Sequence, residues 1–356
     1  MVSYINSIIR FLVFPFVRRG ELKDGVSALV CCRDEEYNIT LCLESLLGLV
    51  DQIVCIDHNS SDQTYSKMLD FQNKYSNRIN IIVQQFNGTS LKDARNFGLQ
   101  SVQYNWLLNC GGDFIFDTKN KEVQELFSSL KKSNDLAAFR LSFVNLYGDL
   151  RHTYKNANVI GKGENYIVKL IKGVQFVEKD KFDYIAFPRY YENRSISIPF
   201  FFHLSGMKSD ERLIYRNCYF EWREIVNFLK VKKVEDSPFL NFEYFSKYWN
   251  DYLFQTNDIK SLKYRYMRQL CELSIQIYDK DKILPYPKVI NDIIDFGYER
   301  FEIKYQNNKP YIRIDKEDKM MTIYEPTSED LNWSVANFKE KIYAKEYLKE
   351  IKLKYK

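Results

Sequence analysis

The sequence predicts an α/β protein with a doubly wound, mostly parallel sheet and a mainly helical C-terminal extension. Three observations predict this fold class. Between residues 26 and 116, short apolar runs alternate with segments of helical periodicity. The connections between them are short, as in successive βα units, which build parallel sheets. From about residue 212 onward, the apolar residues recur mainly at helical spacing.

The four predicted strands of the parallel part are continuous apolar runs, which is typical of strands buried on both faces of a sheet. They span residues 26–32, 53–57, 79–86 and 106–110. Helices are expected between them, because apolar residues recur there every three or four positions. These helices span residues 38–49, 61–75 and 91–102. Ligands of a doubly wound sheet bind outside the carboxyl ends of its strands, so the loops after these strands are the expected site.

The remainder of the chain is less regular. The predicted elements are a helix near 121–132, strands near 136–146 and 166–171, an irregular Phe/Tyr-rich segment over 173–203, helices at 222–229, 242–253 and 261–278, a hairpin near 302–315, and a last amphipathic helix over 327–354. We therefore divide the chain into an N-terminal amphipathic, apolar segment (1–25), an α/β domain (26–215) and a mostly helical C-terminal region with a hairpin (216–356).

Composition and charge limit the function. The apolar fraction is 45% and the charged fraction 28%, as in soluble globular proteins. Seven cysteines without a CxxC pair indicate reduced, buried thiols and a cytoplasmic location. The net charge of +5 is concentrated at the ends, with +2 in residues 1–25 and +4 in residues 331–356. Two basic ends argue against nucleic-acid binding and favour peripheral contact with the anionic inner face of a membrane.

The N-terminal run IIRFLVFPFV, residues 8–17, is too short to span a bilayer. It also lacks the basic start and the small-residue cleavage site of a secretory signal. Two interpretations remain open. The run is either an interfacial membrane segment or a helix packed on the protein's own core.

Polar side chains follow the first and second predicted strands. Glu35 lies in an acidic loop that is either ligand-binding or a polar helix start. Asp57 ends the second strand, where its carboxylate can accept a hydrogen bond from a nucleobase or a ribose hydroxyl. Ser60 and Asp62 follow it and either contact the same ligand or form an Asx turn and a helix cap.

Two further positions suit a phosphorylated ligand. Arg95 offers a planar fork of donors, although a lone arginine on a helix is ordinarily just solvated. Gly111 and Gly112 allow close backbone approach, and Asp113 is a hard oxygen ligand suited to Mg²⁺ or Mn²⁺. No G-x-G-x-x-G or G-K-(S/T) loop supports a dinucleotide-binding or NTPase function.

Taken in order, these motifs resemble those of the family 2 glycosyltransferases of GT-A fold. The matching strings are CCRDEEYNI at 31–39, LESL at 43–46, IDHNSSDQT at 56–64, ARNFG at 94–98 and WLLNCGGD at 106–113. The resemblance is strong over residues 26–115 and fades toward residue 215, and it implies a GT-A domain over 26–215. One departure is that the family's D-x-D motif keeps only its last carboxylate, as Asp113.

The resemblance implies transfer of a sugar from a nucleotide-sugar donor to a hydroxyl of a saccharide or lipid-linked acceptor. Inversion of configuration, a divalent cation (Mn²⁺ or Mg²⁺) and a role in bacterial surface-polysaccharide or lipopolysaccharide assembly are implied as well. The donor would be held by Glu35, Asp57, Ser60, Asp62, Arg95, Gly111 and Gly112, and the metal by Asp113. His203, in an FHL string that resembles the family's HY element, would be a further metal or pyrophosphate ligand.

Inversion requires a general base that removes the proton of the acceptor hydroxyl. Asp183 follows the strand that resembles the family's R-L-F-R element, and Asp210 and Glu211 are rivals just after His203. Two alternatives remain. The altered D-x-D motif would suit an inactive GT-A subunit that binds a nucleotide sugar as a scaffold. A GT-A nucleotidyltransferase is disfavoured, because its glycine-rich first loop is missing.

Overall fold

The computed structural model describes residues 8, 22–88, 90–147, 150–154, 160–179, 182–205, 207–208, 210–231, 233–254, 275–294, 301–306, 309–314 and 322–323. The apolar N-terminal run, apart from Ile8, and the predicted helix over 327–354 lie outside the described residues.

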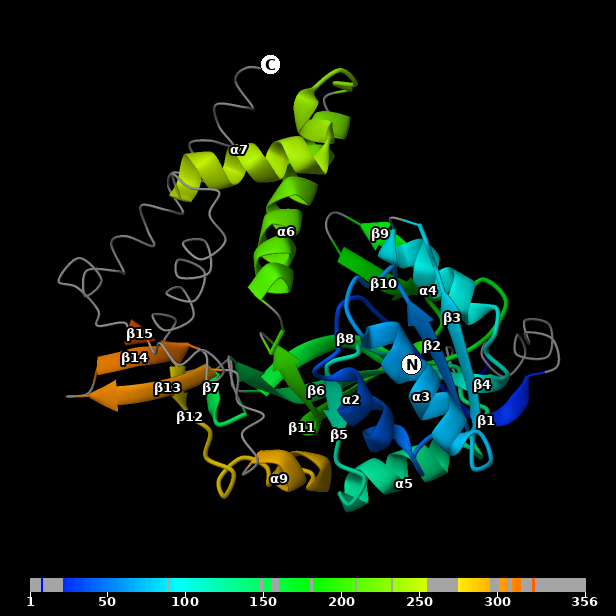
Figure 1. Ribbon diagram of the computed structural model, residues 1–356. Coiled ribbons are helices and arrows are strands. Elements are labelled where there is room, and N and C mark those ends of the chain that lie inside the picture. Colours follow the sequence, from blue (N-terminus) through cyan, green and yellow to red (C-terminus); the bar gives the residue numbers. More distant parts are fainter. Residues whose placement is uncertain are drawn as a thin grey trace.

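The apolar run after residue 25 forms an interior strand of a ten-stranded sheet (Figure 1). Here β1 (Lys23–Cys32) pairs in parallel with β2 (Gln52–Asp57) on one side and β4 (Tyr104–Cys110) on the other. Beyond β2 lies β3 (Asn80–Gln85), also parallel. The last eight residues of β1 are buried, as expected for a strand covered on both faces. The predicted doubly wound α/β fold is therefore confirmed.

The other half of the sheet is largely antiparallel. Beside β4 runs β8 (Ile160–Lys169), which also pairs with β6 (Ala137–Tyr147), both antiparallel. Next to β6 lies β11 (Glu192–Ser205), parallel to β6 and antiparallel to the short β5 (Phe114–Phe116). The edge is completed by β7 (His152–Tyr154) and β12 (Ile275–Ile277).

The segment over 173–203 is not irregular, and that prediction is wrong. It contains a two-stranded antiparallel ribbon, β9 (Gln175–Lys179) with β10 (Phe182–Ala186), followed by β11. The reason is the aromatic run in β11, because aromatic residues suit a pleated, buried surface. Phe201 is fully buried and stacks against Phe143 and Phe114, with ring centroids 5.1 and 4.5 Å away.

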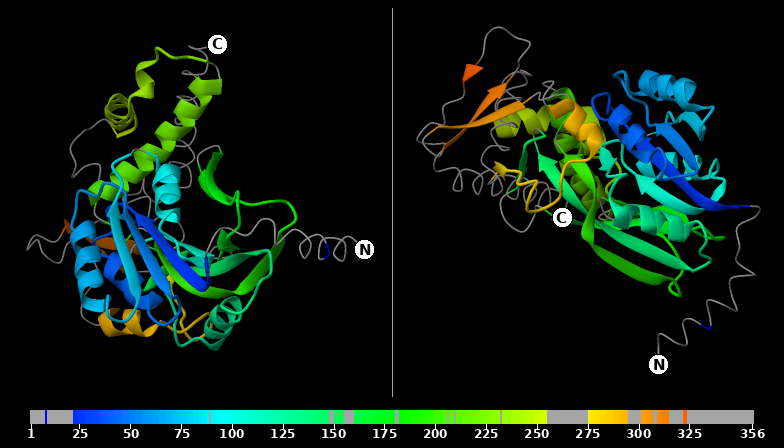
Figure 2. Two further views of the ribbon diagram at one scale, coloured as in Figure 1. Left: turned by 90° about the vertical axis from the view of Figure 1, so that its right-hand side faces the viewer. Right: turned by 90° about the horizontal axis from the view of Figure 1, so that it is seen from below.

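Helices cover both faces of the sheet (Figures 1 and 2). One apolar core lies under α2 (Ile39–Leu46), α3 (Thr64–Tyr75) and α5 (Lys121–Leu130). The opposite core lies under α4 (Leu91–Leu99) and the β9–β10 ribbon. Packing at α4 is close, since a Cβ on Gly98 would lie 2.5 Å from Leu29 Cδ1 of β1.

After β11 the chain turns into α6 (Asp210–Val231), which rises away from the sheet (Figure 1). With η2 (Pro238–Leu240) and α7 (Phe242–Phe254), this helix encloses a small apolar cluster of its own. Farther along, α9 (Lys288–Ile294) packs on the main core through Ile290.

The predicted helix over 261–278 is wrong at its end, because residues 275–277 form strand β12 against β7. The hairpin near 302–315 is formed by β13 (Phe301–Gln306) and β14 (Lys309–Ile314), with β15 (Thr322–Ile323) beside β14. Among the described helices, none combines the length and the apolar character needed to cross a bilayer. All six cysteines in this part of the chain are buried free thiols.

Candidate active site

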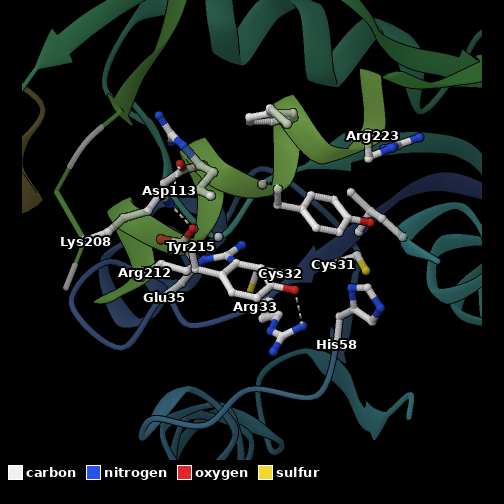
Figure 3. Close-up of a pocket in the computed structure, with 16 residues that line it drawn as sticks. Cys31, Cys32, Arg33, Glu35, His58, Asp113, Lys208, Arg212, Tyr215 and Arg223 are labelled. Atoms are coloured by element: carbon white, nitrogen blue, oxygen red, sulfur yellow. Dashed lines mark hydrogen bonds and ion pairs between the residues drawn. The ribbon is translucent and has the colours of Figure 1, made fainter. Parts of the chain in front are cut away.

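A cavity of about 250 Å³ lies at the carboxyl ends of β1 and β4, next to α6 (Figure 3). Its walls come from the end of β1 and the loop after it, the Gly-Gly-Asp turn after β4 and one face of α6, with single residues added from the loop after β2, the start of α4 and the segment before α6. The residues that line the cavity include Arg33, Glu35, His58, Gly111, Gly112, Asp113, Lys208, Arg212, Tyr215, Arg216 and Arg223.

At one end of the cavity, a buried lysine joins two carboxylates. Lys208, whose side chain is 3% exposed, donates to Glu35 Oε1 and to Asp113 Oδ2, the latter at 3.0 Å. His203 Nε2 lies 3.3 Å from the same Asp113 oxygen, and its Nδ1 lies 3.0 Å from Asn145 Oδ1. The predicted metal ligands Asp113 and His203 are thus brought together, and both are engaged by side chains of this chain.

The position of Lys208 is fixed by its neighbours. Asn38 Nδ2 donates to Glu35 Oε2 at 3.0 Å and to the carbonyl of Met207 at 2.8 Å. One asparagine therefore connects the carboxylate to the segment that carries the lysine. Figure 3 shows Lys208, Glu35 and Asp113 side by side at the foot of α6.

The electrostatics of the two carboxylates differ. Burial raises the pKa of Glu35 despite the opposing charge of Lys208. Burial acts in the same direction on Asp113, but Lys208 and His203 outweigh it and hold the pKa of that carboxyl well below its usual range. Asp113 is therefore ionised at neutral pH and forms an ion pair with the lysine.

These residues do not fit a divalent metal ion as they stand. A metal would need the oxygens of Asp113 and Glu35, and the Lys208 ammonium lies between them. No group of three or more His, Cys, Asp or Glu side chains suited to hold a metal occurs in the part of the chain that the structure describes. Gly111, at the place of the first D-x-D carboxylate, adds no ligand.

Both glycines of the turn are required by space. A Cβ on Gly111 would lie 2.8 Å from Asp113 Oδ1. A Cβ on Gly112 would lie 2.8 Å from Cys32 Sγ and 3.1 Å from Glu35 Cγ. Such distances are too short for ordinary contacts, so these two positions allow Asp113 and Glu35 to reach Lys208.

The loops after β1 and β2 hold each other in place. Ser60 Oγ accepts from the Asp34 amide at 2.9 Å. Asp62 accepts from the amides of Glu36, at 3.1 Å, and Thr64, at 2.9 Å. Ser60 and Asp62 therefore bind backbone and support the loop that carries Glu35, and neither lines the cavity.

Asp57 ends β2 and is fully buried. Its Oδ2 accepts two long hydrogen bonds, from the Ser60 amide at 3.3 Å and from Gln85 Nε2 at 3.4 Å. Its Oδ1 has no hydrogen-bond partner among the described residues. Asp57 does not itself line the cavity, but its charge acts on Cys31 of the adjacent strand β1, which does.

Arg95 and Asp183 do not line the cavity, but the charges of both act on Cys31, which does. The Arg95 guanidinium stacks over Phe176, 5.5 Å from its ring centroid, and its buried Nε has no partner among the residues described. Burial raises the pKa of Asp183, while the charges of Arg95 and Arg223 oppose that rise. Arg223 itself lines the cavity and forms an ion pair with Glu178 of β9.

Asp210 and Glu211 begin α6, and the structure does not describe their side chains.

The structure also shows cavity-lining residues that the sequence analysis did not select. These are Lys208 and the arginines of α6. Arg212, Arg216 and Arg223 recur at helical spacing on the side that faces the cavity, which is a signal that the sequence does carry. A single lysine in a loop carries no such signal.

Comparison with known proteins gives one family match. Residues 27–197 match the model of glycosyl transferase family 2. Curated protein sequences gave no significant match.

Two solved structures illustrate the structural similarity. S. aureus TarS 1–349 in complex with UDP-GlcNAc is 14% identical, with 84% of this chain and 99% of that chain covered and a TM-score of 0.38. Glucosyl-3-phosphoglycerate synthase from Mycobacterium tuberculosis, in complex with Mn²⁺, UDP and glucosyl-3-phosphoglycerate, is 16% identical, with 36% and 44% covered and a TM-score of 0.24. Both TM-scores are too low for either similarity to carry an argument about function.

Proposed function

We propose that the chain transfers a sugar from a nucleotide-sugar donor to a hydroxyl of a saccharide or lipid-linked acceptor, in line with the match of residues 27–197 to the model of glycosyl transferase family 2. One observation carries this proposal. The cavity is lined by a row of cationic side chains, and the adjacent strand end carries a buried carboxylate oxygen, Asp57 Oδ1, with no hydrogen-bond partner among the described residues. A nucleotide sugar needs both, since its diphosphate is anionic and its nucleoside presents N–H and O–H donors.

In this proposal Asp57 Oδ1 accepts a hydrogen bond from the nucleoside. A buried carboxylate oxygen without a donor is costly, and a ligand donor would relieve that cost. Arg33 and the arginines of α6 would face the diphosphate, and Gly111 and Gly112 would let the donor approach the backbone. Glu35, Ser60 and Asp62 would act by positioning, through Lys208 and the loop backbone.

The transfer that fits these residues is an inverting displacement. The acceptor oxygen attacks the anomeric carbon, the bond from that carbon to the diphosphate oxygen breaks, and a base takes the hydroxyl proton. Asp183 is our candidate base, because burial raises its pKa and Arg95 and Arg223 lie near it. Asp210 and Glu211 remain rivals at the start of α6.

The positive charge at both ends of the sequence supports a peripheral location at a membrane. We place the enzyme peripherally at the cytoplasmic face of a membrane, in surface-polysaccharide assembly, because residues 1–25 and 331–356 carry net charges of +2 and +4. Flotation of the full chain with anionic vesicles, and its release by salt, would test this. Flotation that is equal with neutral vesicles would contradict the electrostatic part.

The function itself is tested by a donor screen. The purified chain is incubated with nucleotide sugars and with saccharide or lipid-linked acceptors, and release of nucleoside diphosphate and transfer of labelled sugar are both measured. Transfer from one donor class is expected. Tight binding of a nucleoside diphosphate without transfer or donor hydrolysis under any acceptor would instead favour a scaffold subunit.

A further inference from the structure

The lysine at the centre of the site lies where a metal ion would be expected. In metal-assisted sugar transfer, a divalent cation bridges carboxylates of the protein and the donor's phosphates. Here the Nζ of Lys208 makes the contacts to Glu35 and Asp113 that such a cation would make. Lys208 lies between β11 and α6, 95 residues along the chain from Asp113.

This lysine is built into the fold. Its side chain is almost completely buried, and both carboxylates that it contacts are buried too. An incoming Mn²⁺ would have to expel the ammonium from two ion pairs and leave it buried without them, which is strongly unfavourable. The carboxylate that could hold a second side of a metal is absent, because Gly111 stands at that position.

The cavity walls supply further fixed positive charge. Its lining contains five cationic side chains, Lys208, Arg33, Arg212, Arg216 and Arg223, against two carboxylates. Arg33 and Arg212 lie against the ring of Tyr215, at 4.9 and 5.4 Å from its centroid, and Arg33 Nη1 donates to the tyrosine hydroxyl at 3.4 Å. They share Asp34, whose Oδ2 lies 3.3 Å from Arg33 Nε and 3.9 Å from Arg212 Nε.

Arg216 is a further arginine of α6 that lines the cavity. It lies one helical turn after Arg212, and its buried Nε makes no hydrogen bond within the described part of the chain. A buried guanidinium nitrogen on a cavity wall without an acceptor points to an anionic ligand. Arginine also offers the bidentate geometry that phosphate oxygens prefer.

We propose that Lys208, anchored by Glu35 and Asp113, acts with Arg33, Arg212 and Arg216 to bind and neutralise the donor's diphosphate in place of a divalent metal. The inference rests on the proposed glycosyl transfer and specifies how its leaving group is stabilised. As the bond between the anomeric carbon and the diphosphate oxygen breaks, its electron pair goes to that oxygen. The preorganised ammonium and guanidinium groups offset the new charge, and the ammonium keeps its proton.

The test measures binding without turnover. Inorganic pyrophosphate and a panel of UDP, GDP, CDP, dTDP and ADP are titrated into the full chain by calorimetry, in excess chelator and again with Mn²⁺. We expect at least one nucleoside diphosphate and pyrophosphate to bind with affinities that change less than about twofold between the two conditions. Direct titration of Mn²⁺, followed by electron paramagnetic resonance, should show no tight site that depends on Asp113.

Two variants assign the binding to these cations. Lys208→Gln alone would leave Glu35 and Asp113 buried without their shared cation. The double variant Glu35→Gln/Lys208→Gln replaces both members of one ion pair by neutral side chains, so this variant should fold. Both this variant and Arg216→Gln should weaken pyrophosphate and nucleotide binding by about 10- to 100-fold in chelator. The matched control Lys172→Gln, at an exposed lysine, should leave binding unchanged.

Three outcomes would overturn the inference. Binding of nucleoside diphosphate only with Mn²⁺, at a site lost in Asp113→Asn, would assign the role to a metal and leave the proposed function standing. Unchanged affinity in a folded Glu35→Gln/Lys208→Gln variant would remove Lys208 from the site. Absence of binding by every probe, with and without Mn²⁺, would overturn the proposed function itself.

Discussion

Asp113 and Asp57 are buried carboxylates at the ends of β4 and β2, the two strands that flank β1, yet their surroundings are opposite. Asp113 contacts an ammonium and an imidazole. Asp57 accepts only two long hydrogen bonds from amide groups, and one of its oxygens has no partner among the described residues. The same edge of the sheet therefore carries one carboxylate whose charge is compensated within the fold and one with an oxygen that has no donor among the described residues.

This difference in charge compensation distinguishes two kinds of motif residue on physical grounds. Removing the partner of a compensated buried charge strongly destabilises the fold, because the remaining charge is left buried and unpaired. An uncompensated buried carboxylate weakens the fold slightly and is suited to bind a ligand. Each prediction below compares these two situations, beginning with the largest expected effect.

Replacing Lys208 should cause the largest loss of stability. Lys208→Met leaves Glu35 and Asp113 buried without their common cation, and we expect the free energy of unfolding to fall by about 3–5 kcal/mol. Urea unfolding measures this change. The control Lys172→Met, at an exposed site, should stay within about 0.5 kcal/mol of the unmodified protein. Asp57→Asn should cost far less than Lys208→Met, and an equal cost would contradict the comparison.

Removing the charge of Asp57 should instead weaken ligand binding. Loss of a charge-assisted hydrogen bond is worth about 1.5–3 kcal/mol, so Asp57→Asn should reduce nucleoside diphosphate affinity by about 10- to 150-fold. Calorimetric titration measures this change. Asp62→Asn is the matched control in the same loop. Because Asp62 accepts hydrogen bonds from the Glu36 and Thr64 amides, Asp62→Asn should lower the free energy of unfolding by about 1 kcal/mol and change nucleoside diphosphate affinity little. Equal weakening by both variants would place Asp62 in the nucleotide site as well.

Adding one methyl group at Gly112 should disturb the ion pairs of Lys208 without affecting Asp57. In Gly112→Ala the new Cβ would lie 2.8 Å from Cys32 Sγ and 3.1 Å from Glu35 Cγ. Such overpacking costs about 1–3 kcal/mol and should push Glu35 away from Lys208. Urea unfolding should show the loss, and Cys32→Ala in the same chain should restore part of it. A loss unaffected by Cys32→Ala would assign the strain to the remaining contacts, with Cys32 Cβ at 2.9 Å and Glu35 Cγ at 3.1 Å, and unchanged stability of Gly112→Ala would contradict the prediction.

The sequence was sufficient for the parallel half of the fold, because continuous apolar runs such as residues 26–32 are typical of strands buried on both faces. It also located Asp57 at the end of a buried strand, since a carboxylate that follows an apolar run is a local feature. It could not identify Lys208, because the pairing of this lysine with Glu35 joins residues 173 positions apart and depends on burial. The strand character of β11 was missed because its aromatic run lacks a strict alternation of polar and apolar residues.

Asp183 is a third buried carboxylate, intermediate between the other two. Burial raises its pKa above the ordinary 3.8, and Arg95 and Arg223 oppose the rise without reversing it. Like Asp57 it is incompletely compensated, but like Asp113 it has positive charge nearby. The contribution of Asp183 to the free energy of unfolding should therefore depend on pH with a sign opposite to that of a well-paired carboxylate.

The sign follows from counting protons. Below about pH 3.8, Asp183 is protonated in both the folded and the unfolded chain, so it adds no pH dependence. Between that pH and its raised native pKa, the folded state binds more protons, so its contribution to stability falls as pH rises. Relative to the unmodified protein, Asp183→Asn should therefore gain stability over this window, by up to about 1.4 kcal/mol per unit of pKa difference. Urea unfolding at a series of pH values from about 4 to 7 measures the gain. Arg95→Gln, which removes one opposing charge, should enlarge the pH-dependent loss in an otherwise unmodified chain. A gain that shrinks as pH rises would mean that Arg95 and Arg223 compensate Asp183 fully, and would group it with Asp113.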